Sequence, residues 1–137
     1  MVTAVIDTNV LVSAIVGHGR PRKLVLTLLQ EHTVVSSTAM LAELADVLTR
    51  DKFAEIKNSQ INALLAILAR KSVLVAIKQP FQVFEEDPDD NLVLTTAHEE
   101  KAHYIVSGDK HLLSLREFKG IKVVTVKRML ELLNSKE

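Results

Sequence analysis

The sequence predicts an α/β protein: a three-layer α/β/α sandwich around a mainly parallel sheet of four or five strands. Short runs of β-branched residues alternate with longer stretches of helical periodicity, a pattern typical of parallel strands joined by crossover helices. Hydrophobic residues make up 47% of the 137 positions, which is sufficient for a substantial core. We therefore expect residues 1–137 to form a single domain.

The first half of the chain begins with a strand at 2–6 (VTAVI), a β-branched run. A helix is expected over 21–31, with proline in its first turn, where its missing N–H is tolerated. TVVS at 33–36 predicts a second strand. A serine or threonine at 37–38 can cap the next helix, which is expected to end near Arg50.

The middle of the chain continues with a helix over 59–71, for which Ser59 is a capping residue, and a strand over 72–77. The stretch 78–90 (KQPFQVFEEDPDD) is predicted to be a loop within the domain. A further helix is expected over 89–102.

The last third of the chain predicts two strands and a closing helix. HYIVS at 103–107 and KVVTV at 122–126 are the expected strands, and residues 126–135 form an amphipathic helical pattern.

The charge and composition limit the function classes. Seventeen basic and seventeen acidic residues give a formal net charge of zero, which argues against coating nucleic acid by bulk charge but permits a local binding surface. The absence of cysteine excludes disulfides and thiolate metal sites. The N-terminal apolar run is interrupted by Asp7 and Asn9 and lacks a basic leader, so no signal peptide or membrane segment is expected. We expect a cytoplasmic protein.

Two aspartates stand where predicted strands end. Asp7 directly follows the first strand, and Asp109 follows YIVSG near the end of the chain. Ligands of open parallel sheets bind at the carboxyl ends of the strands, so the two carboxylates could meet there. Each could equally cap the turn that follows it.

Two further acids are placed by helical periodicity. Glu43 lies at the border of the apolar arc of its helix. It could point along the edge of the core, or it could be a solvated surface residue. Asp90 heads an inward-facing stripe, and the helix N-terminus favours its ionised form. Asp87 and Asp89 lie off that stripe and could be outer groups of a site, N-caps or ordinary loop acids.

These four carboxylates come from four separate segments. Two unit charges about 4 Å apart repel by about 4 kcal/mol at an effective dielectric near 20, so a cluster must protonate, spread or bind a cation. Oxygen ligands favour hard ions, which predicts one or two Mg²⁺ or Mn²⁺ ions. No dinucleotide-binding, P-loop, HExxH or GxSxG motif is present, and the five histidines are interpreted as surface or turn residues.

At this point the sequence resembles the PIN domain family, and more narrowly the PIN proteins that are toxins of toxin–antitoxin pairs. The resemblance covers nearly the whole chain. It rests on four segments: VIDTNVLVSA (5–14), STAMLAELADVL (37–48), DPDDNLVLTTA (87–97) and YIVSGDKHLLSL (104–115).

The resemblance implies a metal-dependent ribonuclease that leaves a 5′-phosphate and a 3′-hydroxyl. By motif matching, the acidic positions of the family fall on Asp7, Glu43, Asp90 and Asp109. The first, third and fourth are expected to bind metal directly, and Glu43 to bind metal or orient the water. Two supporting polar groups would be Asn9 and Ser107. An antitoxin partner and a homodimer are also implied.

Substrate contacts are predicted from basic residues near the expected site. Arg20, Arg22 and Lys23 could contact RNA phosphates, or could simply form a solvated helix start. Lys110, next to Asp109, could contact phosphate or merely offset the acidic charge. The alternative to an endoribonuclease is a non-catalytic PIN-like module whose acidic pocket binds a cation or a protein partner.

Overall fold

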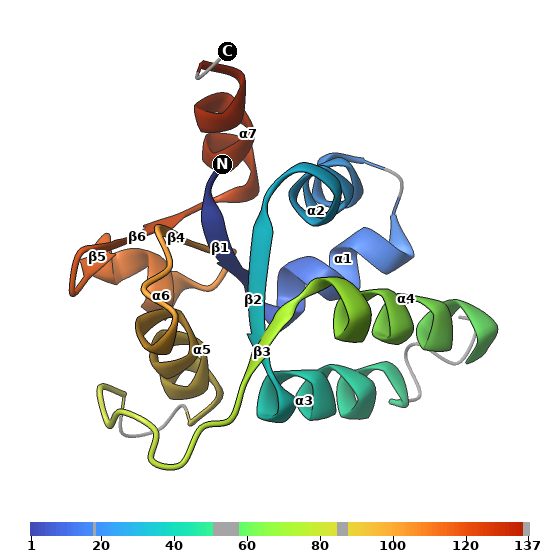
Figure 1. The fold of residues 1–137 in the computed structure, drawn as a ribbon, viewed down its shortest axis with the longest axis horizontal. Helices are drawn as coiled ribbons and strands as arrows, with labels where there is room; N and C mark the ends of the chain where they lie inside the picture. The colour runs from blue at the N-terminus through green and yellow to red at the C-terminus, as the bar shows by residue number, and fades with distance from the viewer. Residues whose placement is uncertain (18, 51–57, 85–87, 136–137) are drawn as a thin grey trace.

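A six-stranded sheet runs through the centre of the structure, a computed structural model that describes residues 1–17, 19–50, 58–84 and 88–135 (Figure 1). Five strands are parallel, and only the last strand of the order runs antiparallel to its neighbour. The strands lie in the order β3 (Val73–Val75), β2 (Thr33–Ser37), β1 (Thr3–Ile6), β4 (Tyr104–Val106), β6 (Ile121–Val124) and β5 (Glu117–Phe118).

The strand count is one higher than the four or five predicted. The additional strand, β5, has two residues and pairs with β6 through a tight turn at Lys119 and Gly120. Both turn residues have positive φ, at 51° and 85°, as the favoured two-residue hairpin turn requires. A two-residue strand is too short to produce a recognisable alternation of apolar and polar residues.

Seven helices surround this sheet in the described part of the chain (Figure 1). The predicted helices are confirmed, with ends that differ by at most three residues. They are α2 (Arg20–Glu31), α3 (Thr38–Leu48), α4 (Asn58–Lys71), α5 (Pro88–Glu99) and α7 (Val126–Ser135); the two that the sequence did not predict are α1 (Thr8–Val16) and α6 (Lys110–Leu115).

The alternation of side chains along the strands divides the core into two apolar layers. Ile6 and Val106 pack with α1, α2, α4 and α7 on one face of the sheet. Val5 and Ile105 face the opposite way and pack with α5 and α6. Both sides of the central strands are therefore buried, which is why these strands are apolar throughout. The predicted three-layer sandwich is confirmed.

Two segments differ in detail from the prediction. The strand expected over 72–77 is shortened to the three residues of β3, at the edge of the sheet, where Val73 and Leu74 are partly exposed. The helix expected over 89–102 ends at Glu99, and Lys101 adopts a left-handed φ of 50°. Of the predicted loop 78–90, residues 85–87, which include Asp87, lie outside the described residues.

No helix in the described ranges combines the length and the apolar character needed to cross a membrane.

Candidate active site

The parallel pairing of β1 and β4 brings Asp7 to the segment that carries Asp109. Ile6 pairs with Val106 at the ends of the two strands, so the next residues leave the sheet side by side. The backbone N–H of Asp7 donates to the carbonyl of Val106 at 2.9 Å. Two acids about 100 positions apart in sequence therefore reach the same edge of the sheet, at the carboxyl ends of its strands.

Ser107 connects the two acidic segments. Its hydroxyl donates to Oδ2 of Asp7 at 2.7 Å and accepts from the backbone N–H of Asp109 at 2.9 Å. Ser107 is fully buried and Asp7 is 6% exposed, so this hydrogen bond fixes a carboxylate that water scarcely reaches. Asp109 in turn caps α6 by accepting from the backbone N–H groups of His111 and Leu112 through Oδ1. Asp109 therefore caps the helix that follows it and also lies at the edge of the sheet where the site was expected.

Asp90 reaches the site from the other face of the sheet, in the first turn of α5. Its stripe of Val93, Leu94 and Ala97 is buried, as predicted, and Asp90 itself is 5% exposed. Oδ2 of Asp90 lies 3.9 Å from Nδ1 of His111. The apolar stripe therefore anchors the helix in a rotation that turns the aspartate inward.

Glu43 contributes the fourth carboxylate from α3. The hydroxyl of Thr8 donates to its Oε2 at 3.3 Å. Burial, and then the negative charge of Asp89, raise the pKa of Glu43 to about 7; Asp7 adds a smaller effect in the same direction, and the hydrogen bond from Thr8 opposes it. A carboxyl group with this pKa is one that a neighbouring cation would ionise.

All four acids line one cleft with a volume of about 390 Å³, which we call the acidic cleft. Asn9 lies on its rim in the first turn of α1 and is exposed. The structure therefore brings together five of the predicted site residues, with Ser107 directly behind them. The cleft is lined by Asp7, Thr8, Asn9, Val12, Ser13, Glu43, Val47, Arg50, Asp89, Asp90 and Asp109.

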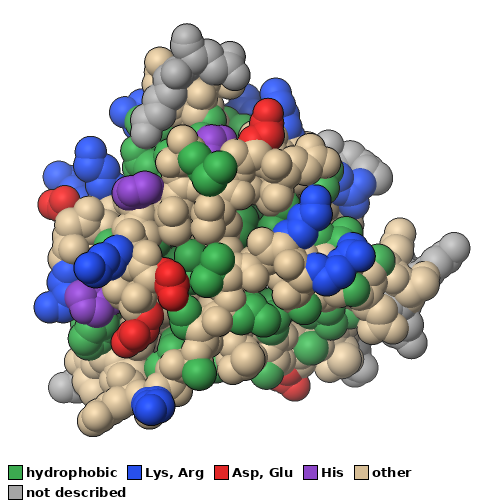
Figure 2. Space-filling view, in the orientation of Figure 1, with side chains coloured by type: hydrophobic (Ala, Val, Ile, Leu, Met, Phe, Trp, Pro, Cys, Tyr) green, Lys and Arg blue, Asp and Glu red, His purple; other side chains and the backbone are tan. Residues whose placement is uncertain are grey.

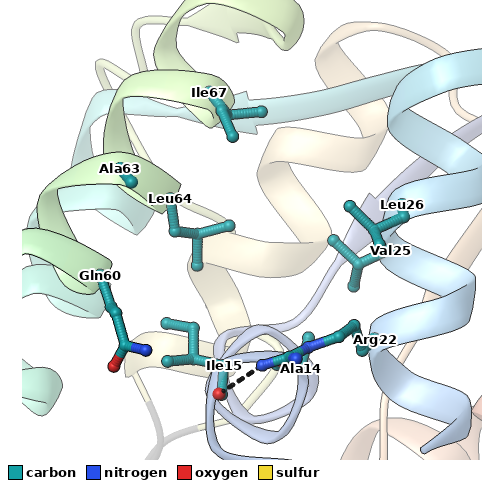
Figure 3. Close-up of a pocket in the computed structure, with 9 residues that line it drawn as sticks. All are labelled: Ala14, Ile15, Arg22, Val25, Leu26, Gln60, Ala63, Leu64 and Ile67. Atoms are coloured by element: carbon teal, nitrogen blue, oxygen red, sulfur yellow. Dashed lines mark hydrogen bonds between the residues drawn. The ribbon is translucent and has the colours of Figure 1, made fainter. Parts of the chain in front are cut away.

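The basic residues predicted to contact substrate are dispersed. Arg22 points away from the acidic cleft: its guanidinium donates to the carbonyls of Ala14 and Ile15 at 2.8 Å, at the C-terminal end of α1 (Figure 3). Lys23 and Lys110 are exposed and do not line the cleft. Arg20 lines a neighbouring hollow described below.

Arg22 borders an apolar hollow of about 370 Å³ between α1, α2 and α4. In it, Leu64 and Ile67 of α4 face Val25 and Leu26 of α2 (Figure 3). Apolar side chains also reach the surface over the region where these three helices meet, with basic side chains beside them (Figure 2). This hollow is separate from the acidic cleft, since the two share no lining residue.

Two residues that line or adjoin the acidic cleft, Arg50 and His111, were missed in the sequence, and a site role for Asp89 was left open. Asp89 is off the inward stripe of α5, yet it lines the cleft and acts on Glu43. Arg50 lines the cleft two residues beyond the end of α3. His111 is exposed, as a surface histidine should be, but its ring faces Asp90. No motif signalled Arg50; for His111, its position two residues after Asp109 was the available clue.

The donor set fits a divalent cation. One ligand atom each from Asp90, Asp109 and His111 lie within 4.8 Å of one another, so a single ion could contact all three. Asp7 and Glu43 add carboxylate oxygens to the same cleft. Mostly oxygen ligands with one imidazole suit Mg²⁺ or Mn²⁺, and the imidazole also admits a softer transition metal.

Comparison with known proteins identifies the family of the chain. The family model for the PIN domain matches residues 3–111. The chain belongs to the PIN domain family. This match spans the first acid of the cleft through His111 and excludes α7.

A relative in sequence and a solved structure also resemble the chain. The uncharacterized protein MJ1680 of Methanocaldococcus jannaschii is 36% identical over 121 residues, covering 85% of this chain and 76% of that protein. PAE2754 from Pyrobaculum aerophilum has a similar fold, with a TM-score of 0.63 at 13% identity, covering 98% of this chain and 90% of that one.

Two further structures share the PIN fold. VapBC2 from Rickettsia felis, bound to a DNA fragment from their promoter, gives a TM-score of 0.60 at 17% identity, covering 90% of this chain and 98% of that one. The PIN domain endonuclease Utp24 gives 0.56 at 16% identity, covering 90% and 84%. At these identities the likeness establishes the fold of the chain.

Proposed function

We propose that this PIN domain, acting as a single unit over residues 1–137, is a Mg²⁺- or Mn²⁺-dependent endoribonuclease. The observation that carries the proposal is the meeting of Asp7, Glu43, Asp90 and Asp109 in one cleft, from four separate segments of the chain. Membership of the PIN family and the fold shared with the endonuclease Utp24 support nuclease chemistry.

Asp7, Asp90 and Asp109 are the proposed metal ligands, and His111 can join them. When bound, the ion would offset the negative charge of the cleft, polarise a phosphoryl oxygen of the substrate and lower the pKa of water. Ser107 orients Asp7 through its 2.7 Å hydrogen bond, so the carboxylate is fixed before any ligand arrives. This preorganisation avoids an entropic cost at the moment of binding.

Glu43 is proposed either to bind metal or to orient the attacking water. Thr8 donates a hydrogen bond to one of its oxygens, and a pKa raised to about 7 by burial would let the carboxyl gain or lose a proton near neutral pH. In-line displacement of the 3′ oxygen would leave a 5′-phosphate and a 3′-hydroxyl. Asn9, on the rim of the cleft, is proposed as a supporting polar group.

The test is metal-dependent cleavage of an unstructured RNA, with Asp7→Asn as the inactive variant. Cleavage should require Mg²⁺ or Mn²⁺, stop in EDTA and fall by at least a hundredfold in the variant, as expected for loss of a charge-stabilising group. Cleavage that persists in both EDTA and Asp7→Asn would remove the proposal.

We further propose that the protein is a cytoplasmic toxin restrained by an antitoxin, with a homodimer as its assembly. The fold shared with VapBC2 supports the toxin–antitoxin part. The apolar hollow between α1, α2 and α4, near the half-exposed Leu26, is a surface that a protein partner could cover. Co-purification with the product of an adjacent small reading frame, and the mass in solution by light scattering, test the partner and the dimer respectively.

A further inference from the structure

A second hollow, of about 370 Å³, adjoins the acidic cleft. Asn9 and Ser13 line both, and they lie one helical turn apart on α1, where the hydroxyl of Ser13 donates to the carbonyl of Asn9 at 3.0 Å. The second hollow continues from this shared wall to the first turns of α2 and α7. There it is lined by Arg20 and Lys127, and we call it the basic hollow.

The two hollows have opposite charge. The acidic cleft is lined by five carboxylates and one cation, Arg50. The basic hollow is lined by two cations and by no aspartate or glutamate among the described residues. Arg20 and Lys127 are both exposed, and neither forms a salt bridge with any residue that the structure describes. Their charges are therefore available to a ligand.

Backbone groups strengthen the positive character of the basic hollow. Arg20 opens α2, and Lys127 is the second residue of α7, so two helix N-termini lie at its wall. Neither helix has an acidic residue in its first turn to offset the partial positive charge of its N-terminus. At α7 the hydroxyl of Thr125 accepts from the backbone N–H of Arg128 at 3.1 Å, and no carboxylate in the part of the chain that the structure describes caps either helix. Anionic groups are the ligands that such a wall favours.

We propose that the basic hollow binds a phosphate of the RNA strand next to the phosphate held in the acidic cleft, with Arg20 and Lys127 as its cationic contacts. This inference rests on the proposed nuclease function and extends it to the path of the substrate. Asn9 and Ser13 line both subsites, so the strand would cross α1 at these two residues. Contacts to phosphate fix the register of a strand without reading its sequence.

The first experiment measures the salt dependence of oligouridine binding, with Asp7→Asn in every protein to prevent cleavage. The double variant Arg20→Gln/Lys127→Gln should lower the slope of log affinity against log salt by about 1.4, because each phosphate contact to a single strand contributes about 0.7. The matched control is Arg70→Gln/Arg128→Gln, which removes the same charge from exposed positions on α4 and α7 outside both hollows. Its slope should stay close to that of the parent.

The second experiment tests register with oligouridines that carry one neutral methylphosphonate linkage at successive positions. At one position near the cleavage site, the neutral linkage should weaken binding to the parent protein. The same linkage should have no further effect on binding to Arg20→Gln/Lys127→Gln. Such non-additivity identifies the linkage that the two cations contact. If no position shows it, the register part of the inference is wrong.

The outcomes separate this inference from the nuclease proposal. Loss of slope in the double variant, with no cleavage by the protein that retains Asp7, would remove the nuclease function and leave the phosphate subsite. Cleavage with equal slopes in the test and control variants would overturn the subsite alone. Failure of oligouridine to bind at all would overturn the subsite as well.

Discussion

Ser107 donates a 2.7 Å hydrogen bond to Asp7 across 100 positions of sequence, and both side chains are buried. The same hydroxyl accepts from the backbone of Asp109, so one serine positions two acids of the cleft. The relationship depends on the parallel pairing of β1 with β4. It links the stability of the sheet edge to the geometry of the site.

Ser107→Ala should lower the free energy of unfolding by about 1–3 kcal/mol, because a buried carboxylate oxygen loses its donor. It should also weaken metal binding, since Asp7 is no longer held in one orientation. Urea denaturation and a metal titration followed by melting temperature measure the two effects. Ser114→Ala, at an exposed serine on α6, is the control and should change neither. Equal behaviour of the two variants would contradict the role given to Ser107.

The raised pKa of Glu43 should make the stability of the metal-free protein depend on pH. Its pKa is about 7 when folded and 4.5 when unfolded, so the folded state binds the proton more tightly. The resulting stabilisation is complete below pH 4.5 and is lost as the pH rises through 7. Glu43→Gln stays neutral throughout. Relative to wild type, it should therefore gain stability between pH 5 and pH 8, as measured by urea denaturation in EDTA.

The matched comparison for Glu43 is Asp89→Asn, which removes the charge that contributes most to the raised pKa after burial. In this variant the same pH-dependent loss of stability should be smaller and should occur at lower pH. If the difference in stability between wild type and Glu43→Gln is constant from pH 5 to pH 8, the pKa of Glu43 is not raised.

Metal addition should raise the melting temperature. An ion that binds only the folded state adds about 2.7 kcal/mol at a hundredfold excess over its dissociation constant. The rise should be larger at pH 8 than at pH 6, because metal and proton compete for Glu43. Asp90→Asn should abolish most of the rise, whereas Glu99→Gln, at the exposed opposite end of α5, should retain it. An unchanged melting temperature in wild type would argue against a cation site.

We expect the imidazole of His111 to influence which metal ion the site prefers. Its ring nitrogen lies close to the carboxylates of Asp90 and Asp109, and an imidazole ligand favours Ni²⁺ over Mg²⁺. His111→Ala should therefore lower the affinity for Ni²⁺ by roughly tenfold or more, with a smaller effect on Mg²⁺. Calorimetric titration of each ion measures this difference. His98→Ala, in the last turn of α5, is the control. Equal losses for both ions would place His111 outside the coordination shell.

Arg22 should contribute to the stability of the fold and not to RNA binding. Its guanidinium donates to two carbonyls at the end of α1, so Arg22→Gln should cost about 1.5–3 kcal/mol of unfolding free energy. Arg20→Gln, two positions earlier and exposed, should leave stability unchanged while weakening oligouridine binding. Chemical denaturation and binding assays on the same pair of variants test this division of roles. If Arg22→Gln weakens oligouridine binding and leaves stability unchanged, Arg22 contacts the substrate.

The sequence determined the fold class, and it named four acids that the structure places in one cleft. The periodicity of apolar residues shows which way a side chain points from its own helix, which turned Asp90 inward and put Glu43 at the border of the core. Asp90 illustrates this: its apolar stripe alone predicts an inward carboxylate, and the structure buries it. For Asp7 and Asp109 the pattern left a turn cap and a site ligand open, and the resemblance to the PIN family assigned them to the site. The helices α1 and α6 escaped prediction for opposite reasons, since α1 is buried on most sides and α6 has only six residues.

The tertiary structure decided which side chains meet across segments. The effect of Asp89 on Glu43, the approach of His111 to Asp90, and the bridge from Ser107 to Asp7 all join different elements. It also turned Arg22 away from the cleft and placed Arg20 and Lys127 at the wall of one hollow. These relationships depend on the packing of helices against the sheet to within an ångström. Sequence periodicity gives the direction of a side chain, but the distance between two elements is set only when the core between them is packed.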